Sequence, residues 1–162
     1  MLFRSIRLAV GKKDKVLYEP GQHEVRIGKG IVARDGSDLT ILTHGTTVAQ
    51  ALDAAEELET QGISTRVVDM FTLKPIDEDL ILRCAEETGG RFVVLEDHLA
   101  YGGLATRIAD VLADRGVQLT AFERLGIPQV YAGFGEDEQL RDKHGYGLSA
   151  TVEAARRVAA AS

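Results

Sequence analysis

A chain of 162 residues has the length of one domain, and 44% of its residues are hydrophobic, which is enough for a core of its own. Its formal net charge of −6 argues against a general nucleic-acid binder, because such proteins carry a basic surface. No apolar run reaches the length of about 18 residues that a membrane helix needs, and the first residues lack the apolar core of a signal peptide. The single Cys84 cannot form an internal disulfide. We therefore expect a cytoplasmic protein with no membrane partner.

The first part of the chain differs in character from the rest. Residues 1–14 are basic and include the short strand-like pattern LFRSIRLAV, which we interpret as the tail of a preceding unit. Residues 23–27 alternate in polarity, as an edge strand does. Residues 29–34 are followed by Asp35-Gly36, a tight-turn signal, so we expect them to form a hairpin with residues 38–43 and to run antiparallel to the other strands.

A strand-helix-strand unit follows. Residues 38–43 are apolar and β-branched, and the apolar residues between Val48 and Leu58 recur at helical spacing. Gly62 ends this helix, because glycine tolerates the left-handed conformation of helix ends, and residues 65–70 form the next strand. Two strands joined through a helix lie parallel, with a right-handed crossover.

The remaining elements repeat this alternation. Asp77 is a good helix N-cap, with Ile76 and Ile81 placed for a hydrophobic staple around it. The expected elements are a helix to about residue 88, a buried strand at 92–96, a helix from Leu104, a strand at 118–124, a short polar helix at 136–143 and a final helix at 150–160. We therefore expect an α/β fold, a three-layer α/β/α sandwich around a five-stranded, mixed and mostly parallel sheet with one antiparallel edge strand.

In such a sheet, ligands and partners bind at the carboxyl ends of the strands. This rule selects the loops at residues 43–47, 70–75 and 96–103. The candidate functional residues on or beside them are His44, Asp69, Lys74, Glu96, Asp97, His98, Tyr101, Gly102 and Gly103.

Each candidate also has a plainer interpretation. His98 with Glu96 and Asp97 has the residue types of an acid/base pair, but adjacent loop residues more often form a solvated turn. His44 precedes a helix, where it suits either phosphate binding or a structural turn. Gly102-Gly103 resembles an anion-binding loop, and close packing of helix on strand explains it equally well.

The composition and spacing point to no metal site. His, Cys, Asp and Glu nowhere recur at the spacing of a dedicated metal centre, and Cys84 fits the buried face of a helix. Lys74 is a cation at the mouth of the sheet edge, or an ordinary surface lysine beside a proline.

Three segments together carry a family resemblance. They read DLTILTHGTTVAQALDAAEELETQGISTRVVDMFTLKPID, VVLEDHLAYGGLATRIADVLAD and HGYGLSATVEAA, in this order. The chain resembles the C-terminal domain of transketolase-type thiamine-diphosphate enzymes, which include transketolases, their split two-chain forms, 1-deoxyxylulose-5-phosphate synthase and the β subunits of 2-oxoacid dehydrogenases. The resemblance covers about residues 15–161, so we expect residues 15–162 to form this domain.

The resemblance also implies what lies elsewhere. In this family, thiamine diphosphate and Mg bind between a diphosphate-binding domain and a pyrimidine-binding domain, and this sequence contains neither. Residues 1–14 resemble the end of a pyrimidine-binding domain, where an arginine after the last strand helps to hold the sugar phosphate. Arg7 is the residue in that position, and its planar fork suits a phosphate.

The expected function is therefore that of a C-terminal domain or subunit of a transketolase. The complete enzyme would transfer two-carbon ketol units between sugar phosphates in the pentose phosphate chemistry of the cell, with the cofactor supplying the carbanion chemistry. This chain would contribute assembly and the rim of the substrate channel, and would bind no cofactor alone. Its expected partners are subunits that carry the diphosphate- and pyrimidine-binding domains, in a dimeric assembly.

Three alternatives stay open. The first is a β-subunit-like piece of a 2-oxoacid dehydrogenase, which would associate with a lipoyl-bearing partner. The second is a non-catalytic assembly module, which would bind partner chains without raising their activity. The third is a free-standing small-ligand binder that uses the Gly102-Gly103 loop, which phosphate would stabilise against heat.

Overall fold

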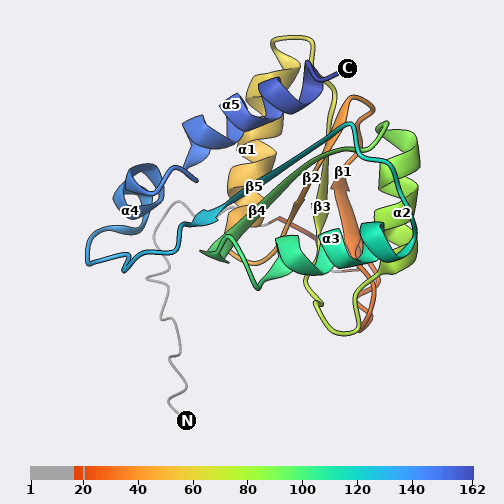
Figure 1. The fold of residues 1–162 in the computed structure, drawn as a ribbon, viewed down its shortest axis with the longest axis horizontal. Coiled ribbons are helices and arrows are strands. Elements are labelled where there is room, and N and C mark those ends of the chain that lie inside the picture. Colours follow the sequence, from red (N-terminus) through yellow and green to blue (C-terminus); the bar gives the residue numbers. More distant parts are fainter. Residues whose placement is uncertain (1–16, 20) are drawn as a thin grey trace.

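The fold is built on one five-stranded sheet (Figure 1). The computed structural model describes residues 17–19 and 21–162. The strands are β1 (Ile31–Arg34), β2 (Leu39–Thr43), β3 (Thr65–Asp69), β4 (Arg91–Leu99) and β5 (Ala121–Ile127). They lie in the order β1-β3-β2-β4-β5, with β1 antiparallel to β3 and all other neighbours parallel. The expected mixed sheet with one antiparallel edge strand is confirmed.

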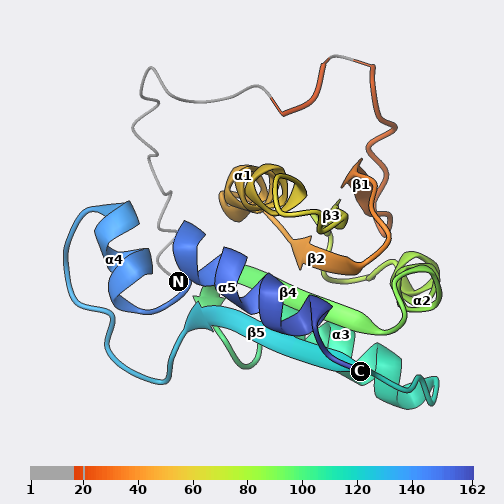
Figure 2. The ribbon, with the colours of Figure 1, turned by 90° about the horizontal axis from the view of Figure 1, so that it is seen from above.

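Helices cover both faces of the sheet, which confirms the three-layer sandwich (Figure 2). Helices α1 (Thr47–Glu59) and α5 (Leu148–Ala159) pack on one face, and α2 (Glu78–Glu87) and α3 (Leu104–Asp114) pack on the other. The short α4 (Asp137–Lys143) precedes α5 beyond the end of the sheet. Successive residues of β2 serve both cores, since Ile41 packs against α1 and α5 while Leu42 packs against α2 and α3.

The expected hairpin between the first two strands is wrong. β1 pairs with β3 and not with β2, and the connection at residues 35–38 crosses the start of β3 instead of turning tightly. Gly36 permits this crossing, because a Cβ there would lie 2.3 Å from the carbonyl carbon of Thr65. Two reciprocal hydrogen bonds then join Asp38 and Ser64: Asp38 N donates to Ser64 O at 2.9 Å, and Ser64 N donates to Asp38 Oδ2 at 2.7 Å.

Several elements also differ from the expectation. Residues 23–27 form no strand, and the segment that follows them contacts the loop at 72–77, with Gly28 N donating to Thr72 Oγ1 at 3.1 Å. β5 lies at Ala121–Ile127, three residues later than the expected strand at 118–124. β4 continues beyond Glu96 to Leu99, which pairs with Ile127 after an irregularity in the register. Part of the segment that the sequence placed in a loop is therefore strand.

The start of α2 is as expected. The Asp77 side chain accepts a hydrogen bond from Leu80 N at 3.2 Å and caps the helix, with Glu78 and Asp79 in the first turn. Ile76 and Ile81 are both buried in the same core cluster, as a hydrophobic staple requires. Asp77 also accepts from Gly30 N at 3.1 Å, so the same carboxylate fixes the entry to β1.

Candidate functional site

The three loops that the sequence selected meet at one edge of the sheet. β2, β3 and β4 are neighbours and parallel, and they end at Thr43, Asp69 and Leu99. Thr43 and Asp69 are register partners, and Met70 N donates to Thr43 O at 2.7 Å. The carboxyl edge is thus assembled as the topology requires, and the question is what each side chain does there.

Glu96 caps helix α3. Its buried carboxylate accepts hydrogen bonds from Leu104 N at 2.8 Å and Ala105 N at 3.1 Å. Gly103 makes this approach possible, because a Cβ at Gly103 would stand 1.9 Å from Glu96 Oε2. The negative charge at the positive end of the helix is favourable, and both oxygens are engaged in structure. Glu96 and Gly103 therefore form a cap, not an open anion-binding loop.

Asp97 points to a different set of partners. It accepts a hydrogen bond from the Tyr146 hydroxyl at 2.9 Å and lies 3.4 Å from Arg141 Nη2. Burial and the bond to Asp97 raise the pKa of Tyr146 above its usual range. Arg141 is also paired with Asp137 at 2.7 Å and donates to Gln50 Oε1 at 3.3 Å. We call this set, with Thr46, the Arg141 network.

His98 does not join either group. Its Nδ1 lies 3.9 Å from Glu96 Oε2, beyond hydrogen-bond distance, and 3.1 Å from the carbonyl of Leu99. Both oxygens of Glu96 are already engaged by backbone N–H groups of α3, and Asp97 is engaged by Tyr146 and Arg141. The structure therefore does not assemble them into an acid/base pair.

A second cluster surrounds Asp69. Its Oδ2 accepts a hydrogen bond from the Tyr18 hydroxyl at 3.2 Å, whereas Oδ1 is buried without a hydrogen-bond partner. Burial raises the pKa of Asp69, and the Tyr18 hydrogen bond and nearby His44 oppose that rise. His44 Nε2 is likewise buried without a hydrogen-bond partner. Tyr18 in turn lies edge-on to His23, with ring centroids 5.1 Å apart, so this cluster holds residues 17–19 against the sheet.

The other candidates lie apart from these clusters. Lys74 is exposed beside the cis Lys74-Pro75 bond. Tyr101 is 61% exposed and stacks on the guanidinium of Arg124, whose Cζ is 5.0 Å from the ring centroid. Gly102 has a positive φ of 90° and donates to Thr106 Oγ1 at 2.8 Å, so it shapes the turn into α3. Arg7 lies outside the described residues.

Sequence reasoning missed the Arg141 network. Arg141 lies in a helix that is polar apart from Leu140, and only the acid at i−4, Asp137, hints at a paired arginine. Its partners Asp97 and Gln50 are 44 and 91 residues away, so no local pattern reports them. The arginine is 8% exposed, which makes it a structural residue of the edge.

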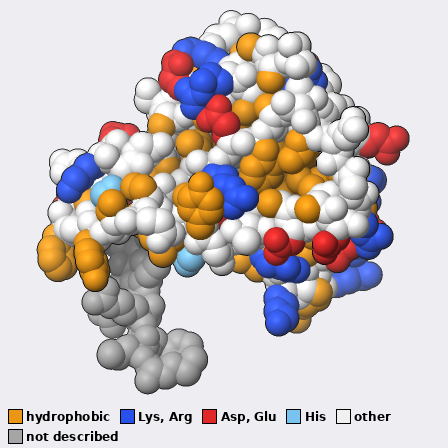
Figure 3. Space-filling view, in the orientation of Figure 1, with side chains coloured by type: hydrophobic (Ala, Val, Ile, Leu, Met, Phe, Trp, Pro, Cys, Tyr) orange, Lys and Arg blue, Asp and Glu red, His pale blue; other side chains and the backbone are white. Residues whose placement is uncertain are grey.

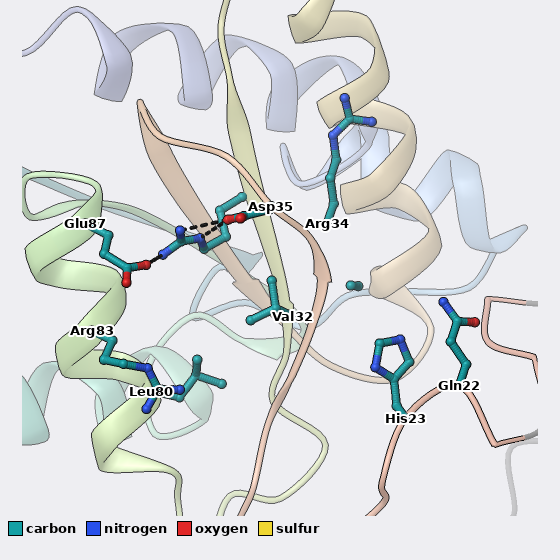
Figure 4. A pocket seen from close by; sticks show the side chains of 10 residues that line it. Gln22, His23, Val32, Arg34, Asp35, Leu80, Arg83 and Glu87 are labelled. Carbon is teal, nitrogen blue, oxygen red and sulfur yellow. Dashed lines mark hydrogen bonds and ion pairs between the residues drawn. The ribbon is translucent and has the colours of Figure 1, made fainter.

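A pocket of about 430 Å³ lies away from this edge, between β1, α2 and residues 22–23 (Figure 4). In it Arg66 is held between Asp35, at 2.8 Å, and Glu87, while Arg34 points away toward α1. The hydrogen bond from Arg66 lowers the pKa of Asp35. None of the residues selected from the sequence lines this pocket.

The described part of the chain shows neither a metal centre nor a membrane helix. Within residues 17–19 and 21–162, no cluster of His, Cys, Asp and Glu could hold a metal ion. No helix in this described part is long and apolar enough to cross a membrane.

Comparison with known proteins places the chain. The family "Transketolase, C-terminal domain" matches residues 28–151. The 1-deoxy-D-xylulose-5-phosphate synthase of Heliobacterium modesticaldum is 40% identical over 135 residues, which cover 83% of this chain and 21% of that protein. A putative transketolase C-terminal section of Methanocaldococcus jannaschii is 38% identical over 136 residues, which cover 83% of this chain and 41% of that protein.

The fold has a solved counterpart. A structure described as a split gene transketolase, inactive beta4 tetramer, superposes with a TM-score of 0.77 at 36% identity, covering 88% of this chain and 45% of that one. This chain therefore spans less than half the length of each of these relatives. With the family matched over most of its length, the chain belongs to the transketolase C-terminal domain family.

Proposed function

We propose that this chain is the C-terminal domain or subunit of a transketolase-like enzyme that transfers two-carbon ketol units between sugar phosphates. The observation that carries the proposal is the similarity to a split gene transketolase, at 36% identity and a TM-score of 0.77. Residues 1–14 would then be the end of a pyrimidine-binding domain or a linker, and residues 15–162 the C-terminal domain. Its partners would be the subunits that carry the cofactor-binding domains, in a dimeric assembly.

In the complete enzyme, this chain would contribute to assembly and form the rim of the substrate channel. In this family the reaction uses thiamine diphosphate and Mg, which supply the carbanion chemistry. The described residues offer no metal-binding cluster, and at the sheet edge Glu96 is engaged in the α3 cap, Asp97 in the Arg141 network and Asp69 Oδ2 in the hydrogen bond from Tyr18. We therefore assign no chemical step to them.

Purification with a defined activity tests the proposal. The tagged chain is isolated from its native cells, and the eluate is assayed for ketol transfer with and without thiamine diphosphate and Mg. We expect activity that depends on both and that appears only with a copurified protein carrying the diphosphate- and pyrimidine-binding domains. A chain that copurifies with a lipoyl-bearing protein, or with cofactor-domain proteins whose activity it leaves unchanged, would contradict it.

Residues at the rim give a sharper test. His98 and Tyr101 are exposed at the carboxyl edge, and the other candidates lie at the ends of β2, β3 and β4 or on the loops that follow these strands: His44, Lys74, Glu96, Asp97, Gly102 and Gly103. In the reconstituted enzyme we expect the double variant His98→Ala/Tyr101→Ala to lower kcat/KM or subunit affinity several-fold. The matched control is Leu119→Ser, which replaces an exposed residue between α3 and β5. Unchanged assembly and turnover would remove these residues from the proposed rim.

Arg7 has a separate expected effect. If it holds the sugar phosphate, Arg7→Gln raises KM for phosphorylated substrates about tenfold or more and leaves binding of the cofactor unchanged, because a charged hydrogen bond is lost. Arg4→Gln is the control in the same segment. If both changes raise KM equally, Arg7 has no specific contact with the phosphate, and the effect comes from the positive charge of the segment.

A second candidate has its own support. The 40% identity to a 1-deoxy-D-xylulose-5-phosphate synthase favours the C-terminal section of such a synthase. The same eluate, assayed for formation of 1-deoxyxylulose 5-phosphate, separates this candidate from a transketolase.

A further inference from the structure

Hydrophobic side chains protrude from the carboxyl edge beyond β4 and β5. Tyr131 and Phe134 are 104% and 105% exposed, and Val130 is 53% exposed. Leu99 joins them, because it lines one hollow of about 220 Å³ together with Val130 and Tyr131. We call Leu99, Val130, Tyr131 and Phe134 the apolar rim. In Figure 3 hydrophobic side chains stand out at the lower left, over the loop before α4.

The loop at residues 128–135, which carries most of the apolar rim, is held by contacts with α4 and the residue that follows it. His144 Nε2 lies 2.9 Å from the carbonyl oxygen of Ala132, in the middle of the loop. The following helix α4 is held by the buried Arg141, which reaches Asp97 on β4. Side chains that an anchored backbone already presents lose little conformational entropy on binding, and aromatic anchors of this kind dominate many interfaces.

We propose that the apolar rim is the docking surface for the polypeptide that carries the two thiamine-diphosphate-binding domains. This inference rests on the proposed function and names the surface through which the partner is held.

The first reason is where the described chain enters the fold. The Tyr18 hydroxyl donates a hydrogen bond to Asp69, the last residue of β3, so the first described residues lie at the carboxyl edge. β5 lies three strand spacings from β3, about 14 Å away, at the usual distance between strands. In the similar M. jannaschii section and the split transketolase, the matched part is 41% and 45% of the chain. A domain that packs against residues 17–19 at this edge in such a protein would lie within reach of the apolar rim.

The second reason is size and charge. Two aromatic side chains offer about 300–500 Å² of surface, whereas a stable interface buries about 800 Å² on each partner. The apolar rim therefore suits the centre of a larger interface that also takes in residues 97–103. Glu136 and Glu138 are exposed just after Phe134, and the exposed Lys143 ammonium would lie 3.8 Å from a Cβ at Gly133 in the same loop. The partner surface should therefore be an apolar hollow with charges of both signs at its margin.

Site-specific crosslinking tests the inference. Tyr131→p-benzoylphenylalanine is made in the full chain and irradiated in its native cells, with Ile27→p-benzoylphenylalanine, an 80% exposed position near β1, as the control. We expect position 131, and not position 27, to crosslink to a protein that carries the diphosphate- and pyrimidine-binding domains. Crosslinks only to a second copy of this chain would overturn the inference and make the apolar rim a face for self-association.

Binding measurements complete the test. Against the purified copurifying subunit, Tyr131→Ser/Phe134→Ser should weaken affinity about 30-fold or more, as loss of an aromatic hot spot does. Val25→Ser/Ile27→Ser, also at exposed positions, should leave the affinity within about twofold of the unaltered chain. The melting temperatures of both variants should match that of the unaltered chain, because the replaced side chains are exposed.

The outcomes separate this inference from the proposed function. If the chain copurifies with active cofactor-domain subunits but position 131 does not crosslink to them, the inference fails and the proposed function stands. If neither a partner nor a crosslink is found, both fail.

Discussion

At the scale of single residues, the carboxylate of Glu96 shows how a suggestive motif can serve the fold. Both oxygens accept backbone N–H groups at the start of α3. Glu96→Gln turns an amide N–H₂ toward one of these donors, so we expect a loss of about 1–3 kcal/mol in the free energy of unfolding. Urea denaturation measures it, with Glu86→Gln, an exposed change on α2, as the control. Equal stability of the two variants would show that the cap contributes little.

Asp69 and Asp35 should change stability with pH in opposite directions. Burial raises the pKa of Asp69 in the folded state, so its contribution to stability is greatest at low pH and falls as the pH rises above about 4. The bond to Arg66 lowers the pKa of Asp35, so its contribution is present above about pH 4 and is lost in acid. Urea unfolding between pH 3 and 7 measures the free energy of unfolding of Asp69→Asn, Asp35→Asn and the unaltered chain. The difference between each variant and the unaltered chain, plotted against pH, should have opposite slopes for the two variants. Parallel slopes would refute this assignment.

What the sequence reveals at this scale depends on distance along the chain. Asp77 was predicted as a helix cap because the cap and the N–H it binds are three residues apart. The contacts of Asp97 with Arg141 and of Tyr18 with Asp69 join residues 44 and 51 positions apart, and no local pattern encodes them. The strand ends that carry the candidate residues could thus be read from local pattern, but the partners of these residues could not, and their functional role stays a prediction.

At the scale of elements, α4 depends on one buried arginine. We expect Arg141→Met to free α4 and the loop before it, because the change removes the pairs with Asp97 and Asp137. Hydrogen exchange should rise about tenfold or more over residues 128–146 while the central strands keep their protection. Lys143→Met, an exposed change on the same helix, should leave exchange as it is. Faster exchange throughout the sheet would mean that Arg141 stabilises the whole fold and not this element.

The same scale explains the one wrong strand pairing. The antiparallel direction of β1 was inferred from Asp35-Gly36 as a hairpin turn, but this pair has the composition of a tight turn as well as of a crossing. The deciding contact is the passage of Gly36 over Thr65, which lies in a later element. Strand existence and direction follow from local pattern, whereas neighbour order depends on which later strand arrives alongside.

At the scale of the whole molecule, the layered architecture was predictable because alternating strands and helices permit few arrangements. The apolar rim could not be predicted from the sequence. The residues 128–135 read as an ordinary loop, and only the folded chain shows that Tyr131 and Phe134 are left exposed while Tyr146 is buried. Aromatic residues follow no period in this loop, so their exposure depends on the packing of elements far from them in sequence.

The two cores should unfold together. Leu42 packs with α2 and α3, and Leu95 packs with α1 and α5, yet both are fully buried on adjacent central strands. Leu42→Ala and Leu95→Ala should each cost about 2–5 kcal/mol, a large part of the about 5–15 kcal/mol that holds a domain. Because β2 and β4 supply both faces, loosening one core removes support from the other. Each variant should therefore show one transition at a lower temperature, with far-UV circular dichroism and tyrosine fluorescence coinciding. Two separate transitions in either variant would mean that the faces of the sheet are stabilised independently.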